Sequence, residues 1–499
     1  MTRRIRAPVV AVGALAAAWC VATLAFVLIH SAVSGLTFAG PYSAYFPLDQ
    51  LRYLAWIREA GLHGLISDPY RAGAAHLYLQ PLFLISGLLW RAGLSVQAAY
   101  LVWTPVALAV LIWGYWRFIA RFLAGSERAA ALALSLLFLS PLVPLLDYGG
   151  IVNSNGAYYL VTVAGQGAAY WQAWGYLPTI IALGLMPVFV LGLEWLVLRA
   201  PRPRVVVVPA AAGLLVAWLH PWGGIELLLI VVGLLALRRG RGPWRELVVV
   251  AAALALPLIY YAIIAGSDSA FSLAQLRASG NSPLLYPLVA DFGPLLVFGL
   301  LAWRRPRDVG EQILVLWPVA ALMLYLVLGL NSRGTALEGV TLPLAVVAVR
   351  GWRRLRAPHW VGFAALVVAI VPGAFYSAHT FRDTFRDRAV PFALAPGEQR
   401  AVDALGRLRG NVLATRYLAP AVPALDGHAG RVTAGAEELF DGGLAAGAVR
   451  MLIQSDRIQL VISDCLRERA DLSGLLGPLG FQTVRFGCAR VYRRGRASR

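Results

Sequence analysis

The sequence has no lysine and few charged residues of any kind. All 44 basic residues are arginine, and charged residues make up 14% of the 499-residue chain, compared with about 25% in soluble proteins. Hydrophobic residues make up 59%, and the mean hydropathy is +0.68. This composition excludes a set of water-soluble domains and an intrinsically disordered chain. It indicates a polytopic membrane protein, and the exclusive use of arginine suggests a bacterial source.

Cysteine and several common functional motifs are also scarce. The chain has three cysteines, which excludes a disulfide-dense scaffold and a cysteine-rich metal site. We find no phosphate-binding glycine loop, no zinc-ligand spacing and no nucleophile elbow, which argues against ATP-driven transport and serine-type hydrolysis. The net charge of +19 does not predict a nucleic-acid partner, because the arginines cluster at the ends of apolar runs. A divalent metal requirement stays open.

Eleven apolar runs approach or exceed the roughly 20 residues that a membrane-spanning helix needs. The first run follows an arginine-rich start without a convincing cleavage site, so we predict an uncleaved span. The runs are 8–30, 98–120, 128–146, 174–198, 205–220, 222–238, 246–265, 285–303, 312–330, 336–350 and 358–377.

Arginine placement predicts the orientation of these spans, because positively charged loops stay cytoplasmic. Five basic connections alternate with connections that have few positive charges, which predicts a cytoplasmic N-terminus and an extracytoplasmic C-terminus. A further apolar run, 77–90, would break this alternation if it crossed the membrane, so we predict an embedded or re-entrant helix there. The basic connections contain Arg121 and Arg128; Arg199, Arg202 and Arg204; Arg238, Arg239, Arg241 and Arg245; Arg304, Arg305 and Arg307; and Arg350, Arg353, Arg354 and Arg356.

The tail from about residue 378 has the composition of a soluble protein. It combines a helical start at 398–408 with strand-like runs at 411–414, 459–462 and 483–486, separated by turn signals. We therefore expect a small α/β domain outside the membrane. Cys465 and Cys488 fall in this tail, where an oxidising exterior allows a disulfide bond; two buried free thiols are the alternative.

The outer segment 31–97 carries the strongest functional signal. Pro47 predicts a helix start, and Asp49 falls in the first turn, where an anion is favoured. Leucine and isoleucine recur at helical spacing from Leu48 to Ile57, which predicts an amphipathic helix at the membrane face. In the simplest interpretation, Asp49 only caps this helix.

The order of these features resembles the GT-C membrane glycosyltransferases, which use polyprenyl-phosphate-linked sugars. The shared features are one span, an outer acidic residue on an amphipathic helix, a helix opening with Pro81-Leu82-Phe83, and many further spans. The run 412–428, VLATRYLAPAVPALDGH, is similar to the start of the outer domain in bacterial members. The family's usual acidic pair is here Asp49-Gln50.

This resemblance implies a mainly α fold of about eleven transmembrane helices in a bacterial plasma membrane. It implies a catalytic transmembrane domain over 1–377, which includes the outer loop 31–97, and an extracytoplasmic α/β domain over 378–499.

The resemblance also implies roles for individual residues. Asp49 matches the family's loop acid and would deprotonate the attacking hydroxyl as general base. Arginine suits the leaving phosphate through bidentate contacts, with Arg333 as first choice and Arg277 as second; a lipid-headgroup contact is the alternative for Arg333. Further candidate substrate-binding residues, each with a structural role as its alternative, are Gln50, Arg52, Asp68, Arg71, Gln80, Asp147, Trp171 and His220.

The predicted activity is therefore inverting transfer of a hexose or pentose from a polyprenyl-phosphate donor. The acceptor would be a cell-envelope glycan, a glycolipid or a protein on the outer face, and membrane lipid is a further expected partner. A transporter or flippase of lipid-linked precursors is one alternative, although ionisable residues are scarce in the middle of the spans and the two halves of the chain do not look alike. A polymerase or ligase of lipid-linked glycans is the other.

Overall fold

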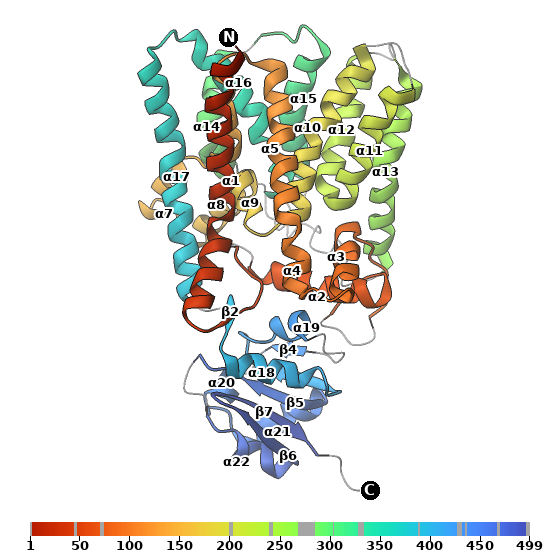
Figure 1. Cartoon of the computed structure of the whole chain (residues 1–499), viewed down its shortest axis with the longest axis vertical. Coiled ribbons are helices and arrows are strands. Elements are labelled where there is room, and N and C mark those ends of the chain that lie inside the picture. The colour runs from red at the N-terminus through yellow and green to blue at the C-terminus, as the bar shows by residue number, and fades with distance from the viewer. Residues whose placement is uncertain are drawn as a thin grey trace. The chain divides into compact units, whose positions relative to one another are not determined.

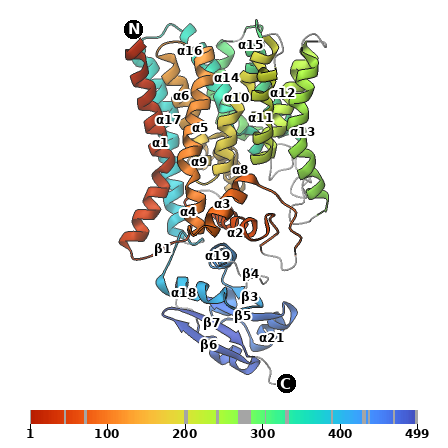
Figure 2. The ribbon, with the colours of Figure 1, turned by 45° about the vertical axis from the view of Figure 1, so that its right-hand side comes forward.

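The computed structural model of the chain divides into two compact units (Figures 1 and 2). One unit contains residues 1–21 and 103–379, and the other contains residues 22–102 and 380–499. The structure describes residues 2–43, 47–69, 74–198, 203–238, 243–267, 285–302, 304–327, 334–387, 390–426, 432–434, 437–466 and 470–495.

The first unit is a bundle of helices that lie side by side in both views. Two long helices, α1 (Thr2–Val33) and α17 (His359–Asp387), run from one unit into the other. The remaining elements of the first unit are α5 (Trp103–Phe122), α6 (Glu127–Leu137), α7 (Leu142–Tyr148), α8 (Ser154–Gly167), α9 (Ala169–Ala173), α10 (Leu177–Leu198), α11 (Pro203–Leu219), α12 (Pro221–Leu237), α13 (Trp244–Ser267), α14 (Tyr286–Leu301), α15 (Val309–Val327), the 3-10 turn η3 (Gly334–Leu337) and α16 (Thr341–Arg354).

Seven helical segments of the described chain are long and apolar enough to cross a membrane. Three further apolar helices of this unit, α11, α12 and α14, have 16 or 17 residues. Each of the eleven predicted runs overlaps a helix, and the polytopic helical class is confirmed, while the count of eleven spans stays a prediction. The seven segments are Ala7–Val33, Val96–Phe122, Glu127–Tyr148, Leu177–Leu198, Trp244–Gly266, Val309–Val327 and His359–Asp387.

Glycine lets two of the long helices pack backbone to backbone. At the crossing of α5 and α10, a side chain on Gly114 would collide with the carbonyl oxygen of Gly184. A Cβ on Gly184 would in turn lie 2.6 Å from the backbone nitrogen of Leu111. Small residues are the usual way for membrane helices to gain close contact, so this pair fixes where α5 and α10 cross.

The second unit contains a five-stranded mixed sheet with strand order β4-β3-β5-β7-β6. Strand β3 runs parallel to β4 and β5, whereas β7 runs antiparallel to β5 and β6. From Leu460 onward both faces of the central strand β5 are buried, which accounts for the apolar run Leu460–Ile462, whereas Gln459 is exposed. The elements are α18 (Pro396–Leu405), β3 (Asn411–Ala414), α19 (Ala421–Leu425), β4 (Val432–Ala434), α20 (Glu437–Phe440), α21 (Ala446–Ser455), β5 (Ile458–Ser463), α22 (Ser473–Leu476), the 3-10 turn η4 (Gly477–Leu479), β6 (Phe481–Phe486) and β7 (Ala489–Arg494).

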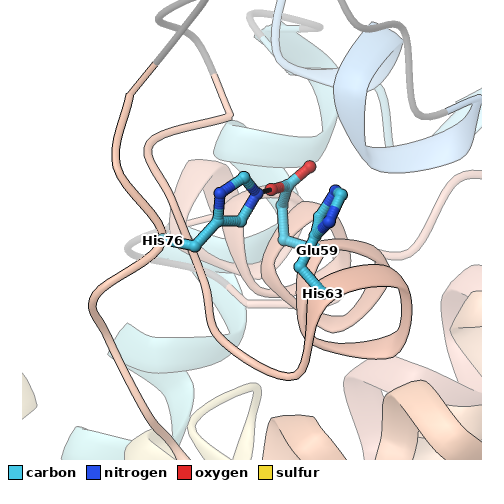
Figure 3. Close-up of side chains that lie close together, drawn as sticks. All are labelled: Glu59, His63 and His76. Atoms are coloured by element: carbon cyan, nitrogen blue, oxygen red, sulfur yellow. Dashed lines mark ion pairs between the residues drawn. The ribbon is translucent and has the colours of Figure 1, made fainter.

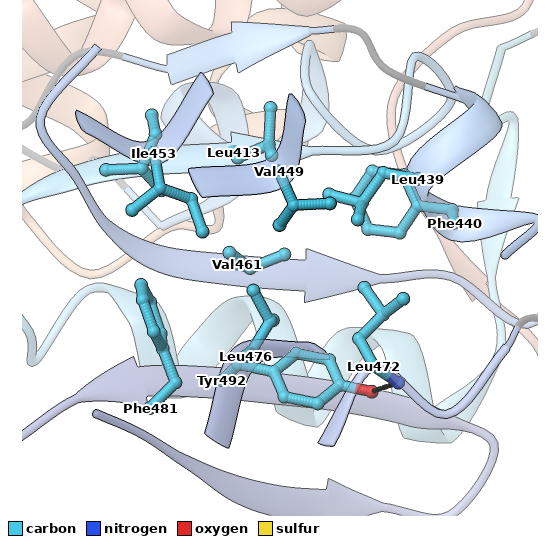
Figure 4. Packing of buried hydrophobic residues seen from close by; sticks show 11 residues of the cluster. Leu413, Leu439, Phe440, Val449, Ile453, Val461, Leu472, Leu476, Phe481 and Tyr492 are labelled. Atoms are coloured by element: carbon cyan, nitrogen blue, oxygen red, sulfur yellow. Dashed lines mark hydrogen bonds between the residues drawn. The ribbon is translucent and has the colours of Figure 1, made fainter. Parts of the chain in front are cut away.

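The core of this domain lies between the sheet and helices α20, α21 and α22 (Figure 4). The Tyr492 hydroxyl accepts a hydrogen bond from the backbone nitrogen of Leu472 at 3.1 Å, so the one polar atom of this buried ring is satisfied. Cys465 and Cys488 form a disulfide bond, which decides between the two states that the sequence left open for this pair. The apolar core residues are Leu413, Leu439, Phe440, Val449, Ile453, Ile458, Val461, Leu472, Leu476 and Phe481.

Residues 22–102 belong to the same unit, in which a short antiparallel ladder pairs β1 (Thr37–Phe38) with β2 (Ala393–Leu394). The segment also contains three helices: α2 (Pro47–His63), α3 (Pro81–Arg91) and α4 (Val96–Leu101). Helix α3 has eleven residues and corresponds to the run 77–90.

Candidate functional site

Asp49 lies in the first turn of α2, as the sequence predicted. Its side chain is 37% exposed, and its Oδ1 atom lies 3.9 Å from Nη1 of Arg52. This carboxylate is therefore accessible, next to a positive charge and near the helix end that favours an anion. Such an arrangement can accept a proton from a substrate or attract a cation.

The apolar face of α2 keeps this helix in place. Leu51, Leu54 and Ile57 are fully buried, while Leu48, at the start of the predicted stripe, is 49% exposed. Across the contact with α3, a Cβ on Gly61 would lie 2.8 Å from the Gly87 carbonyl oxygen. The two backbones can approach because neither position has a side chain.

Two predicted substrate-binding residues of this segment are buried and bonded to backbone. Gln50 accepts hydrogen bonds from the backbone nitrogens of Tyr42 and Ser43 at 2.8 and 2.7 Å. Gln80 caps the N-terminus of α3 by accepting from the nitrogens of Leu82 and Phe83. Both side chains stabilise local backbone, so their contact with substrate stays a prediction.

Arg58 joins α2 to the C-terminal part of the second unit. Its Nε atom donates to the carbonyl oxygen of Ala424 at 2.9 Å, and Nη2 donates to that of Leu425. Its guanidinium also lies 4.9 Å from the centre of the Trp90 ring, a cation–π contact. The helix that presents Asp49 is therefore held directly against α19, within the run 412–428 that the sequence singled out.

Beside this contact, burial raises the pKa of the Asp426 carboxyl to about 7, and the charge of Arg58 is the largest opposing effect. Between about pH 4, the ordinary Asp value, and pH 7, the unfolded chain loses this proton while the folded chain keeps it. Stability therefore falls as pH rises through this window and levels off above it.

We expect Asp426→Asn to remove this loss of stability, because the amide stays neutral at every pH. The unfolding temperature of the purified protein, measured from pH 4 to pH 8, should be higher than wild type at pH 8 and equal to it at pH 4. The control is Asp441→Asn, since Asp441 is exposed. A lower unfolding temperature for Asp426→Asn than for wild type at pH 8 would contradict this account.

Three predicted residues lie in the first unit, with different surroundings. Asp147 accepts a hydrogen bond from the Tyr376 hydroxyl at 2.6 Å. Trp171 is 3% exposed and packs near Trp174. His220 is 5% exposed and caps α12.

His220 has a buried partner that sequence reasoning missed. Its Nδ1 accepts a hydrogen bond from the Gly223 nitrogen at 2.9 Å, so the ring proton sits on Nε2. Nε2 lies 2.8 Å from Oε2 of Glu338, and both side chains are less than 10% exposed. No pattern in the sequence links these residues, which are far apart along the chain.

A cavity of about 840 Å³ lies among α14, α15 and α16. Most of its lining residues are apolar, such as Leu288, Leu337 and Val347, and its arginines include Arg307 and Arg350. These arginines belong to the connections that the sequence predicts to be cytoplasmic. The cavity can therefore hold an acyl or prenyl chain, but the phosphate of a donor on the outer face needs other ligands.

Two of the remaining predicted residues lie in the described part of the chain, and three do not. Asp68 and Arg52 lie in the second unit, and both side chains reach solvent at least in part. The two predicted phosphate ligands, Arg333 and Arg277, and the candidate Arg71 fall outside the described residues.

Comparison with solved structures identifies the fold. The chain is similar to the Archaeoglobus fulgidus oligosaccharyltransferase in its apo form, with a TM-score of 0.54 and 12% identity over 98% of this chain and 75% of that chain. A structure of the archaeal oligosaccharyltransferase AglB from Archaeoglobus fulgidus, in complex with an inhibitory peptide and a dolichol-phosphate, gives a TM-score of 0.49 and 13% identity over 98% of this chain and 74% of that chain. No family model and no curated protein matches the sequence.

The first of these likenesses shows that the chain shares the fold of that oligosaccharyltransferase structure, which confirms the mainly helical membrane class. Membership of the GT-C superfamily stays a prediction.

Proposed function

We propose that this protein is a membrane glycosyltransferase that transfers a sugar from a polyprenyl-phosphate-linked donor to a cell-envelope glycan, lipid or protein. The observation that carries this proposal is the likeness of 98% of the chain to one oligosaccharyltransferase. The proposed setting is a bacterial plasma membrane, with the N-terminus cytoplasmic and the domain 378–499 outside, as the arginine-rich connections favour.

The proposed reaction uses Asp49 as general base. The acceptor oxygen or nitrogen attacks the anomeric carbon, the bond from that carbon to the phosphate oxygen breaks, and polyprenyl phosphate leaves with the electron pair. The acceptor proton passes to the Asp49 carboxylate, which is exposed and held by a buried helix face. Attack opposite the leaving group inverts the anomeric configuration.

The donor lipid calls for an apolar surface and for positive charge. The cavity among α14, α15 and α16 supplies the apolar surface. Arg333 and Arg277, in the segments that precede η3 and α14, are the proposed ligands of the phosphate, whose two oxygens match the guanidinium fork. The other outer-face candidates, from Gln50 to His220, are proposed to line the acceptor side.

A transfer assay tests the proposal. Purified protein in lipid discs is given a panel of radiolabelled polyprenyl-phosphate sugars and envelope extracts as acceptor. We expect one donor class to release polyprenyl phosphate in step with transfer of label, and Arg333→Lys to raise the donor KM because lysine lacks the fork. If the Arg333→Lys enzyme has wild-type donor affinity, Arg333 does not bind the phosphate, and Arg277 becomes the proposed ligand.

The alternative of a lipid-precursor transporter has one supporting observation, which is a set of buried acids in the first unit. Glu226 in α12 and Asp291 in α14 are 1% and 2% exposed. Each lies in the second turn of its helix, and a third acid, Glu194, is paired with Arg121 at 2.6 Å. Movement of donor across vesicles without release of polyprenyl phosphate would favour the transporter.

A further inference from the structure

Three side chains with metal-binding atoms, those of Glu59, His63 and His76, lie close together at the C-terminal end of α2, the helix that also contains Asp49 (Figure 3). Glu59 and His63 lie four residues apart on α2, which puts them on one face of the helix. His76 comes from the segment between α2 and α3. The Glu59 carboxylate lies between the two imidazoles in Figure 3.

The distances within this cluster are short. Nε2 of His76 lies 3.0 Å from Oε2 of Glu59, and the two imidazole rings are 4.0 Å apart between centres. One ligand atom from each residue lies within 4.8 Å of the other two. Ligands about 2.1 Å from a tetrahedral zinc ion are roughly 3.4 Å apart, so small side-chain rotations would bring all three to the ion.

The chemistry of the three groups selects the ion. Two imidazoles and one carboxylate suit Zn²⁺ and similar divalent transition metals, whereas Mg²⁺ and Ca²⁺ prefer oxygen ligands only. Ser67 donates a hydrogen bond to Oε2 of Glu59 at 2.8 Å, the kind of outer contact that orients a carboxylate ligand. His63 is exposed and His76 is partly exposed, which leaves a path for the ion and a fourth position for water.

We propose that Glu59, His63 and His76 bind one divalent transition-metal ion, with Zn²⁺ the best fit. The ion would fasten the segment after α2 to the helix itself. The same segment is closed by a backbone bridge in which the Ile66 nitrogen donates to the Tyr78 oxygen at 2.8 Å. Glu59 lies ten residues after Asp49 on α2, which is about 15 Å along a helix. The ion therefore stabilises the outer segment and does not contact the proposed base.

A binding titration tests this site directly. The full-length protein is purified in detergent without a histidine tag, stripped with a chelator, and titrated with ZnCl₂ while bound metal is measured after dialysis. We expect one zinc ion per chain, a higher unfolding temperature with zinc than without, and no competition by excess Mg²⁺. Slower proteolysis between residues 64 and 80 should accompany binding.

Variants assign the ligands. His63→Ala should lower zinc affinity by roughly 100-fold or more, and Ser67→Ala by roughly 10-fold, the range for an outer partner. Because His63 is exposed, its removal leaves the packing of α2 intact, and this is checked by the unfolding temperature in chelator. His359→Ala is the matched control, since His359 is also exposed. Absence of one-to-one binding to wild type, or unchanged affinity in His63→Ala, would overturn the proposal.

Discussion

Replacing Asp49 with asparagine should lower the rate of sugar transfer by roughly 10²–10⁴-fold, the usual contribution of a general base. The amide cannot accept the proton of the attacking group at neutral pH. The measurement is single-turnover transfer by purified protein with a donor that the wild type uses.

The fold should not change in this variant. Asparagine is nearly isosteric with aspartate and also favours helix N-termini. The side chain is 37% exposed and lies 3.9 Å from Arg52, whereas α2 is held by buried residues such as Leu51 and Leu54. Expression, elution volume and unfolding temperature should therefore match wild type.

Asp147 and Asp68 provide the comparison. Asp147→Asn replaces the charged acceptor of the Tyr376 hydrogen bond with a neutral amide, which weakens that bond. Asp68→Asn changes another acid in the segment 31–97 that contains Asp49. Both should keep far more transfer activity than Asp49→Asn. Near-wild-type turnover in Asp49→Asn would reduce Asp49 to a helix cap and would move the role of base to Asp68.

Sequence periodicity predicted the elements that depend on local pattern. The helix from Pro47 and the strand at 411–414 coincide with α2 and β3. Such elements are visible in the sequence because a buried face repeats apolar residues at the period of the helix or strand. A strand that is buried on both faces instead has a continuous apolar run. The run 128–146 was predicted as one span and corresponds to the candidate span Glu127–Tyr148. The sequence did not show that the helix is interrupted between α6 and α7, next to Pro141, where the ring cannot continue the helical hydrogen bonds.

Contacts between distant segments were not predictable from these patterns. Arg58 bonds to Ala424, which is 366 residues further along the chain, and this contact groups the outer segment with the C-terminal domain. The metal cluster was missed for a related reason. Glu59 and His63 have helical spacing, but His76 reaches them only because the chain turns back after α2.

The largest stability effect is expected at His220, whose replacement by leucine should lower the free energy of unfolding by about 3–5 kcal/mol. The change leaves the Glu338 carboxylate buried without its partner at 2.8 Å. It also removes the acceptor of the Gly223 N–H at the start of α12. The measurement is a denaturant titration of the purified protein in detergent.

A double-mutant cycle measures the interaction energy between His220 and Glu338 separately from the effect of each single substitution. Glu338→Leu alone should cost about 1–3 kcal/mol, because it leaves one buried imidazole nitrogen without its partner. The double variant His220→Leu with Glu338→Leu should be more stable than His220→Leu alone, since neither side chain is then left buried without the other. Strictly additive losses would show that the two side chains do not interact. If the double variant also transfers sugar at the wild-type rate, His220 acts in folding; a raised acceptor KM would instead support the predicted contact with substrate.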